Sequence, residues 1–328
     1  MLRRQPYQGG AMARRFLPQI TRRAVLSGPA ALGALATIGA RAATPLAAPR
    51  PHAPFRFAFV TDAHIEPELN AAAGTRMCFR RVAHETADFV IQGGDHVFDA
   101  LGVNHDRAQS LMDLYTMTEQ VIGKKVHHTI GNHDLYGIYT KSGATPGDLQ
   151  YGKAYYRDHF GPTYYSFDHK GVHFITLDSI GVTADRSYEG RIDADQIAWL
   201  TRDLERQPAG TPIIVTSHIP LVTGFACYSG VLEKPTPHNN LSVVNAAEIV
   251  HLLRGYNVLA VLQGHTHVNE VVTCFGIPFI TGGAVSGNWW KGVHLGTPEG
   301  YTMVSVADNR VTTEYRTYGF RSVDPHDT

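Results

Sequence analysis

The chain has 328 residues, of which 43% are hydrophobic and 18% charged, so it can bury one large core or two modest ones. The formal net charge is zero, but residues 1–42 hold seven arginines and no acid. The rest therefore has 22 basic against 29 acidic side chains, a net charge of −7. A mildly acidic body argues against nucleic-acid binding through bulk charge, and we expect no nucleic-acid partner.

Residues 1–42 have the pattern of an export signal. Arg22 and Arg23 precede seventeen uncharged residues rich in Ala, Gly and Leu, and Ala40 to Ala42 form a small-x-small cleavage motif. The pattern resembles a twin-arginine signal peptide, with Met12 as an alternative start. A membrane anchor is the competing interpretation, but the run is short and weakly apolar for a span of about 20 residues. We expect cleavage, recognition by the twin-arginine export machinery, a periplasmic or secreted location, and no stable membrane anchor.

Export would place the chain where disulfides persist. The chain has three cysteines, Cys78, Cys227 and Cys274, so at most one intramolecular pair can form. Their spacing matches no zinc or redox motif. We interpret them as buried or incidental thiols, and the sequence leaves a disulfide open.

After a proline-containing lead-in at 43–54, short apolar runs alternate with segments of helical period, which predicts one layered α/β domain over 55–328. Strands are predicted at 55–60, 88–92, 125–130, 172–177, 212–216, 257–263 and 277–281, and two more over 301–319 that join at Asp308-Asn309. Helices are predicted at 75–87, 106–122, 193–205 and 244–254. Asp193 and Gln196 resemble a capping box at the start of the third helix.

Polar clusters follow five of the predicted strands. They read DAH (Asp62, His64), GGD (Asp95), GNHD (Asn132, His133, Asp134), SHIP (His218) and GHTH (His265, His267). Ligands of open α/β sheets gather beyond the carboxyl ends of the strands, so these groups can converge in space. One cluster alone, such as GNHD, would be compatible with an ordinary turn.

These residue types suit a pair of divalent metals. Two such ions about 3.5 to 4 Å apart can clamp the attacking and leaving oxygens of a phosphoryl transfer. An anion must lie between them, and a carboxylate supplies it, while neutral imidazoles and an amide oxygen fill the outer positions.

The five motifs, in this order, resemble the calcineurin-like metallophosphoesterase family, whose pattern runs D-x-H, G-D, G-N-H-D/E, H and G-H-x-H. The resemblance covers most of the chain after the signal. It implies a four-layer α-β-β-α sandwich of two mixed sheets with a dinuclear metal site at the carboxyl rim of the strands. It assigns one metal to Asp62, His64, Asp95 and His267, and a second to Asp95, Asn132, His218 and His265.

The resemblance also implies the catalytic roles. A metal-bridging hydroxide is the nucleophile, and His133 stabilises the transition state and protonates the leaving oxygen. Asp134 is expected to orient the His133 ring, and Gly131 to free the backbone that brings Asn132 in. Purple acid phosphatases of this superfamily place a tyrosine ligand where this chain has Phe98. A phenolate-bound ferric site is therefore not expected, and the metal pair stays open among iron, manganese and zinc, divalent or mixed-valence.

Other histidines receive structural interpretations. His96 follows Asp95 and is expected to point to the opposite face of the strand. His127, His128 and His173 lie in predicted strands and are interpreted as core or surface side chains.

Two segments are expected to shape the substrate pocket. Residues 221–243 form a long irregular loop after His218. In GGAVSGNWWKG, Trp289 and Trp290 could stack a base or sugar face and Lys291 could meet a phosphate, although either tryptophan could instead be buried. A similar tail occurs in exported bacterial phosphoesterases that resemble cyclic nucleotide phosphodiesterases. We favour hydrolysis of a small or nucleotide-like phosphodiester; a phosphomonoesterase that scavenges phosphate and a non-catalytic binding module are the alternatives.

Overall fold

The computed structural model describes residues 46–233 and 238–328, so the predicted signal peptide lies outside the described residues. Residues 46–54 form neither helix nor strand, but two backbone hydrogen bonds tie them to the domain. Arg50 N donates to Gly210 O at 2.9 Å, and Ala53 N donates to Lys170 O at 3.2 Å. Within the described ranges, no helix has the length and apolar character needed to cross a membrane.

The first of two large sheets has five strands in the order β13-β12-β1-β2-β3. Its strands are β1 (Phe55–Val60), β2 (Val90–Gln92), β3 (Val126–His128), β12 (Gly300–Ala307) and β13 (Arg310–Thr317). β1, β2 and β3 are parallel, whereas β12 is antiparallel to both of its neighbours. The sheet is therefore mixed.

The second sheet has six strands in the order β10-β11-β9-β8-β5-β4. Its strands are β4 (Tyr165–His169), β5 (Val172–Leu177), β8 (Ile213–Ser217), β9 (Val258–Gln263), β10 (Glu270–Cys274) and β11 (Ile277–Thr281). The four central strands are parallel and the two edge strands antiparallel, so this sheet is mixed too. β6 (Ile180–Val182) and β7 (Tyr188–Gly190) form a separate hairpin.

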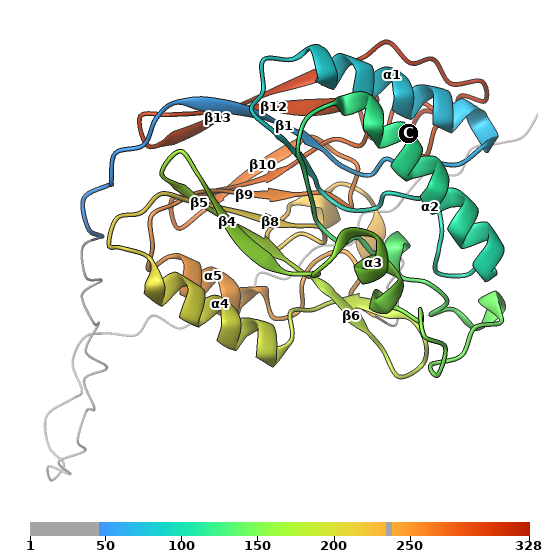
Figure 1. The fold of residues 1–328 in the computed structure, drawn as a ribbon, viewed down its shortest axis with the longest axis horizontal. Coiled ribbons are helices and arrows are strands. Elements are labelled where there is room, and N and C mark those ends of the chain that lie inside the picture. Colours follow the sequence, from blue (N-terminus) through green and yellow to red (C-terminus); the bar gives the residue numbers. More distant parts are fainter. Residues whose placement is uncertain (1–45, 234–237) are drawn as a thin grey trace, which may run out of the picture. The chain divides into compact units, whose positions relative to one another are not determined.

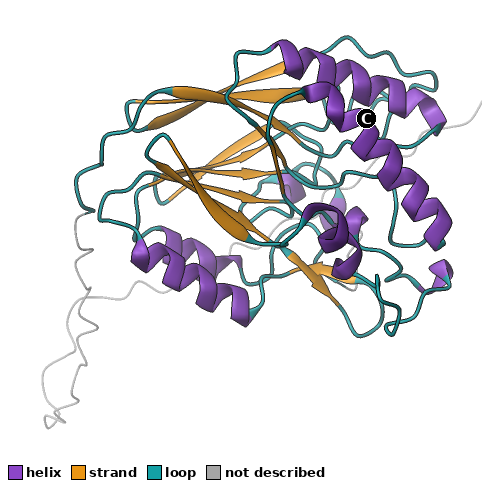
Figure 2. Ribbon diagram, in the orientation of Figure 1, coloured by secondary structure: helices purple, strands orange, loops and turns teal. Residues whose placement is uncertain are grey.

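Helices cover the outer faces of the stacked sheets (Figures 1 and 2): α1 (Ala71–His84) and α2 (His105–Glu119) on the first sheet, and α4 (Ala194–Arg206) and α5 (Ala246–Leu253) on the second. The short helix α3 (Lys153–Phe160) contributes to the core clusters of both layers. One core cluster joins the first sheet to α1 and α2, a second joins the other sheet to α4 and α5, and a third lies between the sheets. The expected four-layer α-β-β-α sandwich is confirmed.

Strand β1 shows how the sequence serves two cores. Phe55, Phe57 and Phe59 belong to the cluster between the sheets, whereas Ala58 and Val60 belong to the cluster under α1. Successive side chains of a strand point to opposite faces, so the three phenylalanines, which are two residues apart, lie on one side. β1 therefore packs against the helical layer on one face and against the second sheet on the other.

The predicted elements are present with shifted ends. The Asp193 side chain caps α4 by accepting a bond from Gln196 N at 2.8 Å, but the Gln196 amide turns to the backbone of Asp178, so the capping box is only half formed. The sequence analysis missed α3, β4, β10 and the β6-β7 hairpin. β4 and β10 are edge strands without a fully buried side chain, so neither has the apolar run that marks a buried strand in the sequence.

Candidate metal centre

The candidate ligands all lie in loops that follow strands at one end of the two sheets. Asp62 and His64 follow β1, Asp95 follows β2, Asn132 to Asp134 follow β3, His218 follows β8, and His265 and His267 follow β9. Parallel strands present their carboxyl ends at the same edge, so each sheet contributes part of one site. The convergence expected from the motifs is present.

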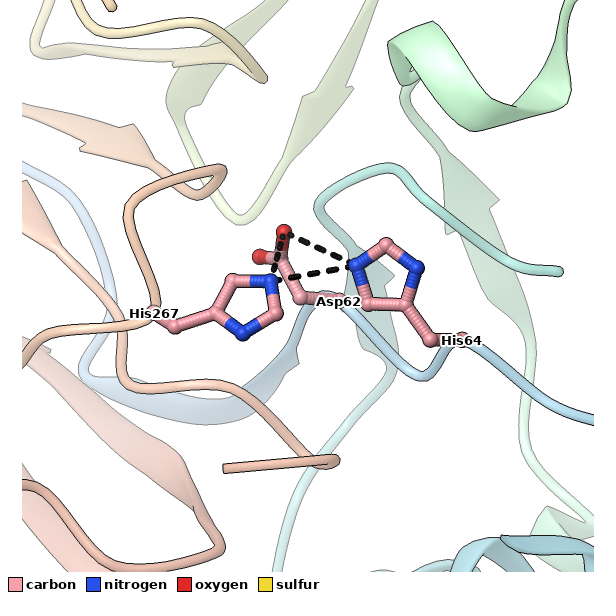
Figure 3. Close-up of side chains that lie close together, drawn as sticks. All are labelled: Asp62, His64 and His267. Carbon is pink, nitrogen blue, oxygen red and sulfur yellow. Dashed lines mark hydrogen bonds and ion pairs between the residues drawn. The ribbon is translucent and has the colours of Figure 1, made fainter. Parts of the chain in front are cut away.

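Asp62, His64 and His267 form the first group (Figure 3). The two Nε2 atoms of His64 and His267 face each other at 3.1 Å, and Asp62 Oδ1 lies 3.3 Å from His267 Nε2 and 3.8 Å from His64 Nε2. All three side chains are buried. Two imidazole nitrogens and a carboxylate oxygen aimed at one point form a donor set suited to a divalent metal.

Asp95 joins this group to a second one. Its Oδ2 lies 3.5 Å from His64 Nε2 and 3.1 Å from His218 Nε2, and Asp95, His218 and His265 form the second cluster of potential ligands. Asp95 Oδ2 thus lies between the imidazole of His64 in the first group and that of His218 in the second. This is the position that a bridging carboxylate needs if two cations are to lie close together.

Buried polar atoms without partners test whether metals fit here. In the described part of the chain, Asn132 Oδ1 and Nδ2 are buried and have no hydrogen-bond partner. An orphaned buried polar group is costly and calls for an explanation such as a bound ion. A cation would satisfy Asn132 Oδ1, so this residue fits the role of a metal ligand.

Backbone carbonyls orient three of the histidines. His218 Nδ1 lies 2.8 Å from Gly93 O, His267 Nδ1 lies 2.6 Å from Gly287 O, and His265 Nε2 lies 2.6 Å from Asn240 O. The other ring nitrogen is then left for the site, which is the usual arrangement behind metal-binding imidazoles. The sequence analysis missed these partners, because any residue can supply a carbonyl and only the fold brings it near.

The ligand loops hold unusual backbone conformations. Asp62, His64, Asp95, His265 and His267 all have positive φ, between 41° and 74°. Residues other than glycine rarely adopt this left-handed region, and such strain persists at functional sites where the surroundings enforce it. These conformations lower the stability of the fold, but they direct the five side chains toward the site.

Gly131 is needed for space and not for a special φ. Its φ is −106°, but a Cβ atom would lie 2.2 Å from both Asp95 N and Asp95 Oδ1. The prediction that Gly131 provides backbone freedom is therefore wrong. A glycine is required there because the GNHD turn packs directly on Asp95 and leaves no space for a Cβ atom.

Burial and charge pairing set the protonation states of the metal-free site. Burial raises the pKa of the Asp95 carboxyl, but His218, His133 and His64 together lower it more, so the net shift is downward. Burial lowers the pKa of His218, but Asp95 and Asp62 outweigh it and raise this pKa to about 9. For His64 and His265 burial dominates and lowers the pKa to about 4. Near neutral pH these two imidazoles are therefore in the ligating form, while His218 holds a proton that a cation must displace.

His133 is half-buried at the edge of the site. Its ring lies edge-on to His64 with centroids 4.8 Å apart, and its Nδ1 is buried without a partner. Its backbone N–H donates to Asp95 Oδ1 at 2.9 Å. The ring is thus close to the ligands, and its role as a proton donor stays a prediction.

The expectation that Asp134 orients the His133 ring is wrong. The Asp134 carboxylate accepts bonds from Gly131 N (2.9 Å), Asp95 N (3.1 Å), His96 N (2.9 Å) and His96 Nδ1 (2.8 Å). Its acceptor capacity is used on the loop after β2 and on its own turn, so it fixes the backbone around Asp95. His96 has the structural role expected of it, and His128 lies behind it at 3.0 Å.

The two tryptophans have different roles. Trp290 is fully buried and donates its indole N–H to His64 O at 2.9 Å, so its expected contact with substrate is wrong. Trp289 is half-buried, and its ring centroid lies 4.0 Å from that of His64 and 5.6 Å from that of Phe98. The Lys291 ammonium lies 3.4 Å from Asp324, and its contact with phosphate stays a prediction.

The cysteines and remaining histidines have structural surroundings. Cys78, Cys227 and Cys274 are all free thiols. His173 pairs with Asp168 and Asp203, and His127 stacks on Phe167 with centroids 3.6 Å apart. These side chains lie outside the candidate ligand groups.

Residues 55–269 match the family model of the calcineurin-like phosphoesterases, over a stretch that contains all seven candidate ligands. The chain belongs to the calcineurin-like phosphoesterase family. As a member, it is a metal-dependent hydrolase of phosphate esters with candidate ligands for two ions. A search of curated proteins gives no match.

Several solved structures share the fold. A dimetal phosphatase from Danio rerio is similar over 81% of this chain and 96% of its own length, with a TM-score of 0.55 and 16% identity. The purple acid phosphatase PPD1 from yellow lupin is similar over 85% of this chain and 54% of its own, with a TM-score of 0.53 and 16% identity. GAP50, the anchor in the inner membrane complex of Plasmodium, is similar over 84% of this chain and 88% of its own length, with a TM-score of 0.50 and 18% identity. At these identities the likeness concerns the fold alone.

Proposed function

We propose that this calcineurin-like phosphoesterase hydrolyses small phosphodiesters, with nucleotide-like diesters as the favoured class, at a centre of two divalent or mixed-valence ions of iron, manganese or zinc. One ion would be held by Asp62, His64 and His267. The other would be held by Asn132, His218 and His265, and Asp95 would contact both ions. When bound, the pair offsets phosphoryl charge and provides a nucleophile from water near neutral pH. The observation that carries this proposal is the place of Asp95 Oδ2 between His64 Nε2 and His218 Nε2, at 3.5 and 3.1 Å.

In the proposed reaction, His133 donates a proton to the departing ester oxygen. Its half-buried ring lies beside His64 at the edge of the ligand groups, where a substrate can reach it. General acid catalysis of this kind contributes about 10² to 10⁴-fold in rate. Asp134 acts indirectly, by holding the loop after β2 at the bridging position.

The preference for a diester is supported by the charges around the site. A phosphomonoester carries two negative charges and benefits from an added basic clamp. In the described ranges, the ion pairs of Asp62 and Asp95 involve only histidines, and Lys291 is paired with Asp324. The half-exposed rings at the edge, Trp289 and Phe98, favour an apolar substituent over an anionic oxygen.

The test compares the rates of the manganese-loaded protein on bis(p-nitrophenyl) phosphate and p-nitrophenyl phosphate. We expect a higher kcat/KM for the diester and loss of activity on both in Asn132→Ala, which removes a ligand. A preference for the monoester would overturn the diester proposal in favour of phosphate scavenging. Tight metal binding without hydrolysis of either ester would favour a binding module.

We also propose export by the twin-arginine route to the periplasm or beyond, supported by Arg22, Arg23 and the apolar run after them. Cell fractionation of the full chain beside Arg22→Lys/Arg23→Lys tests this. We expect the doubly substituted chain to stay in the cytoplasm, whereas equal export of both would contradict the proposal. Intact mass of the exported form tests cleavage after Ala42.

A further inference from the structure

Trp289 lies against three imidazoles of the candidate site. Its ring centroid is 4.0 Å from that of His64, 5.0 Å from that of His267 and 5.0 Å from that of His133. On another side it meets the edge of Phe98, at 5.6 Å and an interplanar angle of 79°. The indole is half-buried, so part of it faces solvent beside two candidate ligands and the proposed acid.

The backbone that presents Trp289 is strained. Trp289 and Trp290 have φ values of 53° and 65°, two consecutive bulky residues in the left-handed region. Each such residue is unfavourable and persists only where surrounding contacts enforce it. The conformation sends Trp290 into the core under α1, against Phe320, and leaves Trp289 at the site.

A network of hydrogen bonds enforces this conformation. The Trp290 indole N–H donates to His64 O, Trp290 N donates to Ser286 O at 2.7 Å, and Ser322 Oγ donates to Trp290 O at 2.7 Å. The last residues of the chain add bonds to the same loop, including Val293 N to Asp327 Oδ1 at 2.7 Å. Trp289 is thus held at a fixed place relative to His64 from both sides of the loop.

We propose that Trp289 is a specificity-determining residue that selects phosphodiesters with a flat, aromatic group on the ester oxygen that is not cleaved. The inference rests on the proposed function. A phosphoryl group bound among the ligands places its substituents next to the rings that line the site, and Trp289 is the largest flat surface there. Stacking of a flat ring on an indole is worth about 5- to 150-fold in affinity and needs no particular hydrogen-bonding pattern.

The experiment uses two diesters with the same leaving group. Bis(p-nitrophenyl) phosphate and methyl p-nitrophenyl phosphate both release p-nitrophenolate, but only the first retains a ring. Their kcat/KM ratio is measured for the manganese-loaded full chain, Trp289→Leu and Trp289→Phe. Leucine keeps apolar contact with the imidazoles but has no flat face, whereas phenylalanine keeps one.

We expect the ratio to fall about 5-fold or more in Trp289→Leu and to stay near the parent value in Trp289→Phe. Inhibition by phenylphosphonate and methylphosphonate gives a readout without turnover, and only the phenyl compound should weaken in Trp289→Leu. Trp199→Leu is the matched control, because Trp199 lies on α4 and packs on Tyr164, with centroids 5.0 Å apart. Metal content is measured for every variant.

The outcomes separate the two proposals. Hydrolysis of both diesters with an unchanged ratio in Trp289→Leu overturns the role of Trp289 and leaves the phosphodiesterase proposal intact. Loss of metal or an equal fall on both diesters in Trp289→Leu and Trp289→Phe means that Trp289 only packs the site, which also overturns it. Absence of hydrolysis of any ester by the parent protein defeats the proposed function itself.

Discussion

Replacing Asp134 by Asn distinguishes a backbone-positioning role from direct help to His133. The Asp134 carboxylate is buried and accepts four hydrogen bonds: three on Oδ2, from Gly131 N, Asp95 N and His96 Nδ1, and one on Oδ1, from His96 N. An asparagine can keep its oxygen at the Oδ2 position. Its amide group then faces the N–H of His96, so one bond is lost and two donors oppose each other.

The magnitude follows from these bonds. A hydrogen bond to a charged group contributes about 1.5 to 3 kcal/mol, and the three remaining bonds weaken when their acceptor becomes neutral. We expect the free energy of unfolding to fall by about 2 to 4 kcal/mol, and the Tm of the metal-free protein by roughly 3 to 7 °C. Because the loop after β2 carries Asp95, we also expect metal affinity to fall by about 10- to 100-fold.

Thermal denaturation of the metal-free protein and competition with a chelator measure the two quantities, and saturating manganese should restore much of the turnover. Asp203→Asn is the matched control. Asp203 lies on α4 and is buried, and its Oδ2 lies 2.8 Å from His173 Nε2. The substitution should lower Tm and leave metal affinity unchanged. Unchanged metal affinity and Tm in Asp134→Asn, with turnover depressed at saturating metal, would refute the positioning role and restore the expected contact with His133.

Three further predictions concern the ligand groups themselves. His133→Ala should keep near-normal metal content while kcat falls about 10² to 10⁴-fold, and depletion of metal in this variant, measured by mass spectrometry, would show that His133 is a ligand. Asp95→Asn should lose most activity and at least one metal per chain, because the bridging charge is gone; two metals retained at full occupancy would argue against the bridge. In the metal-free protein, the raised pKa of His218 stabilises the fold fully below the unfolded value of 6.5, and this stabilisation is lost as pH rises toward about 9. Tm should therefore fall between pH 6.5 and 9, less so in His218→Asn or with manganese bound, and a flat profile in the metal-free parent would contradict the pairing.

The placement of polar clusters after β-prone runs predicted that the clusters converge, and the family resemblance assigned them to two ligand groups. Asp62, Asp95 and His218 lie within three residues of the ends of strands, and parallel strands bring the residues that follow them to one edge of the sheet. The apolar run over residues 55–60 likewise predicted a strand there. These features are local or follow from a general rule of topology, so the sequence carries them.

Other features depended on the tertiary structure. Asp134 turns to the loop after β2 and not to His133, because β2 and β3 are parallel neighbours in one sheet and bring Gly131 into direct contact with Asp95. The adjacent Trp289 and Trp290 are equivalent in sequence, and only a strained backbone and contacts from the end of the chain send one to the core and the other to the site. The carbonyls behind the histidines have no signal in the sequence at all. The physical reason is common to these cases: they depend on which surfaces meet when distant segments pack, and residue type alone does not encode those contacts.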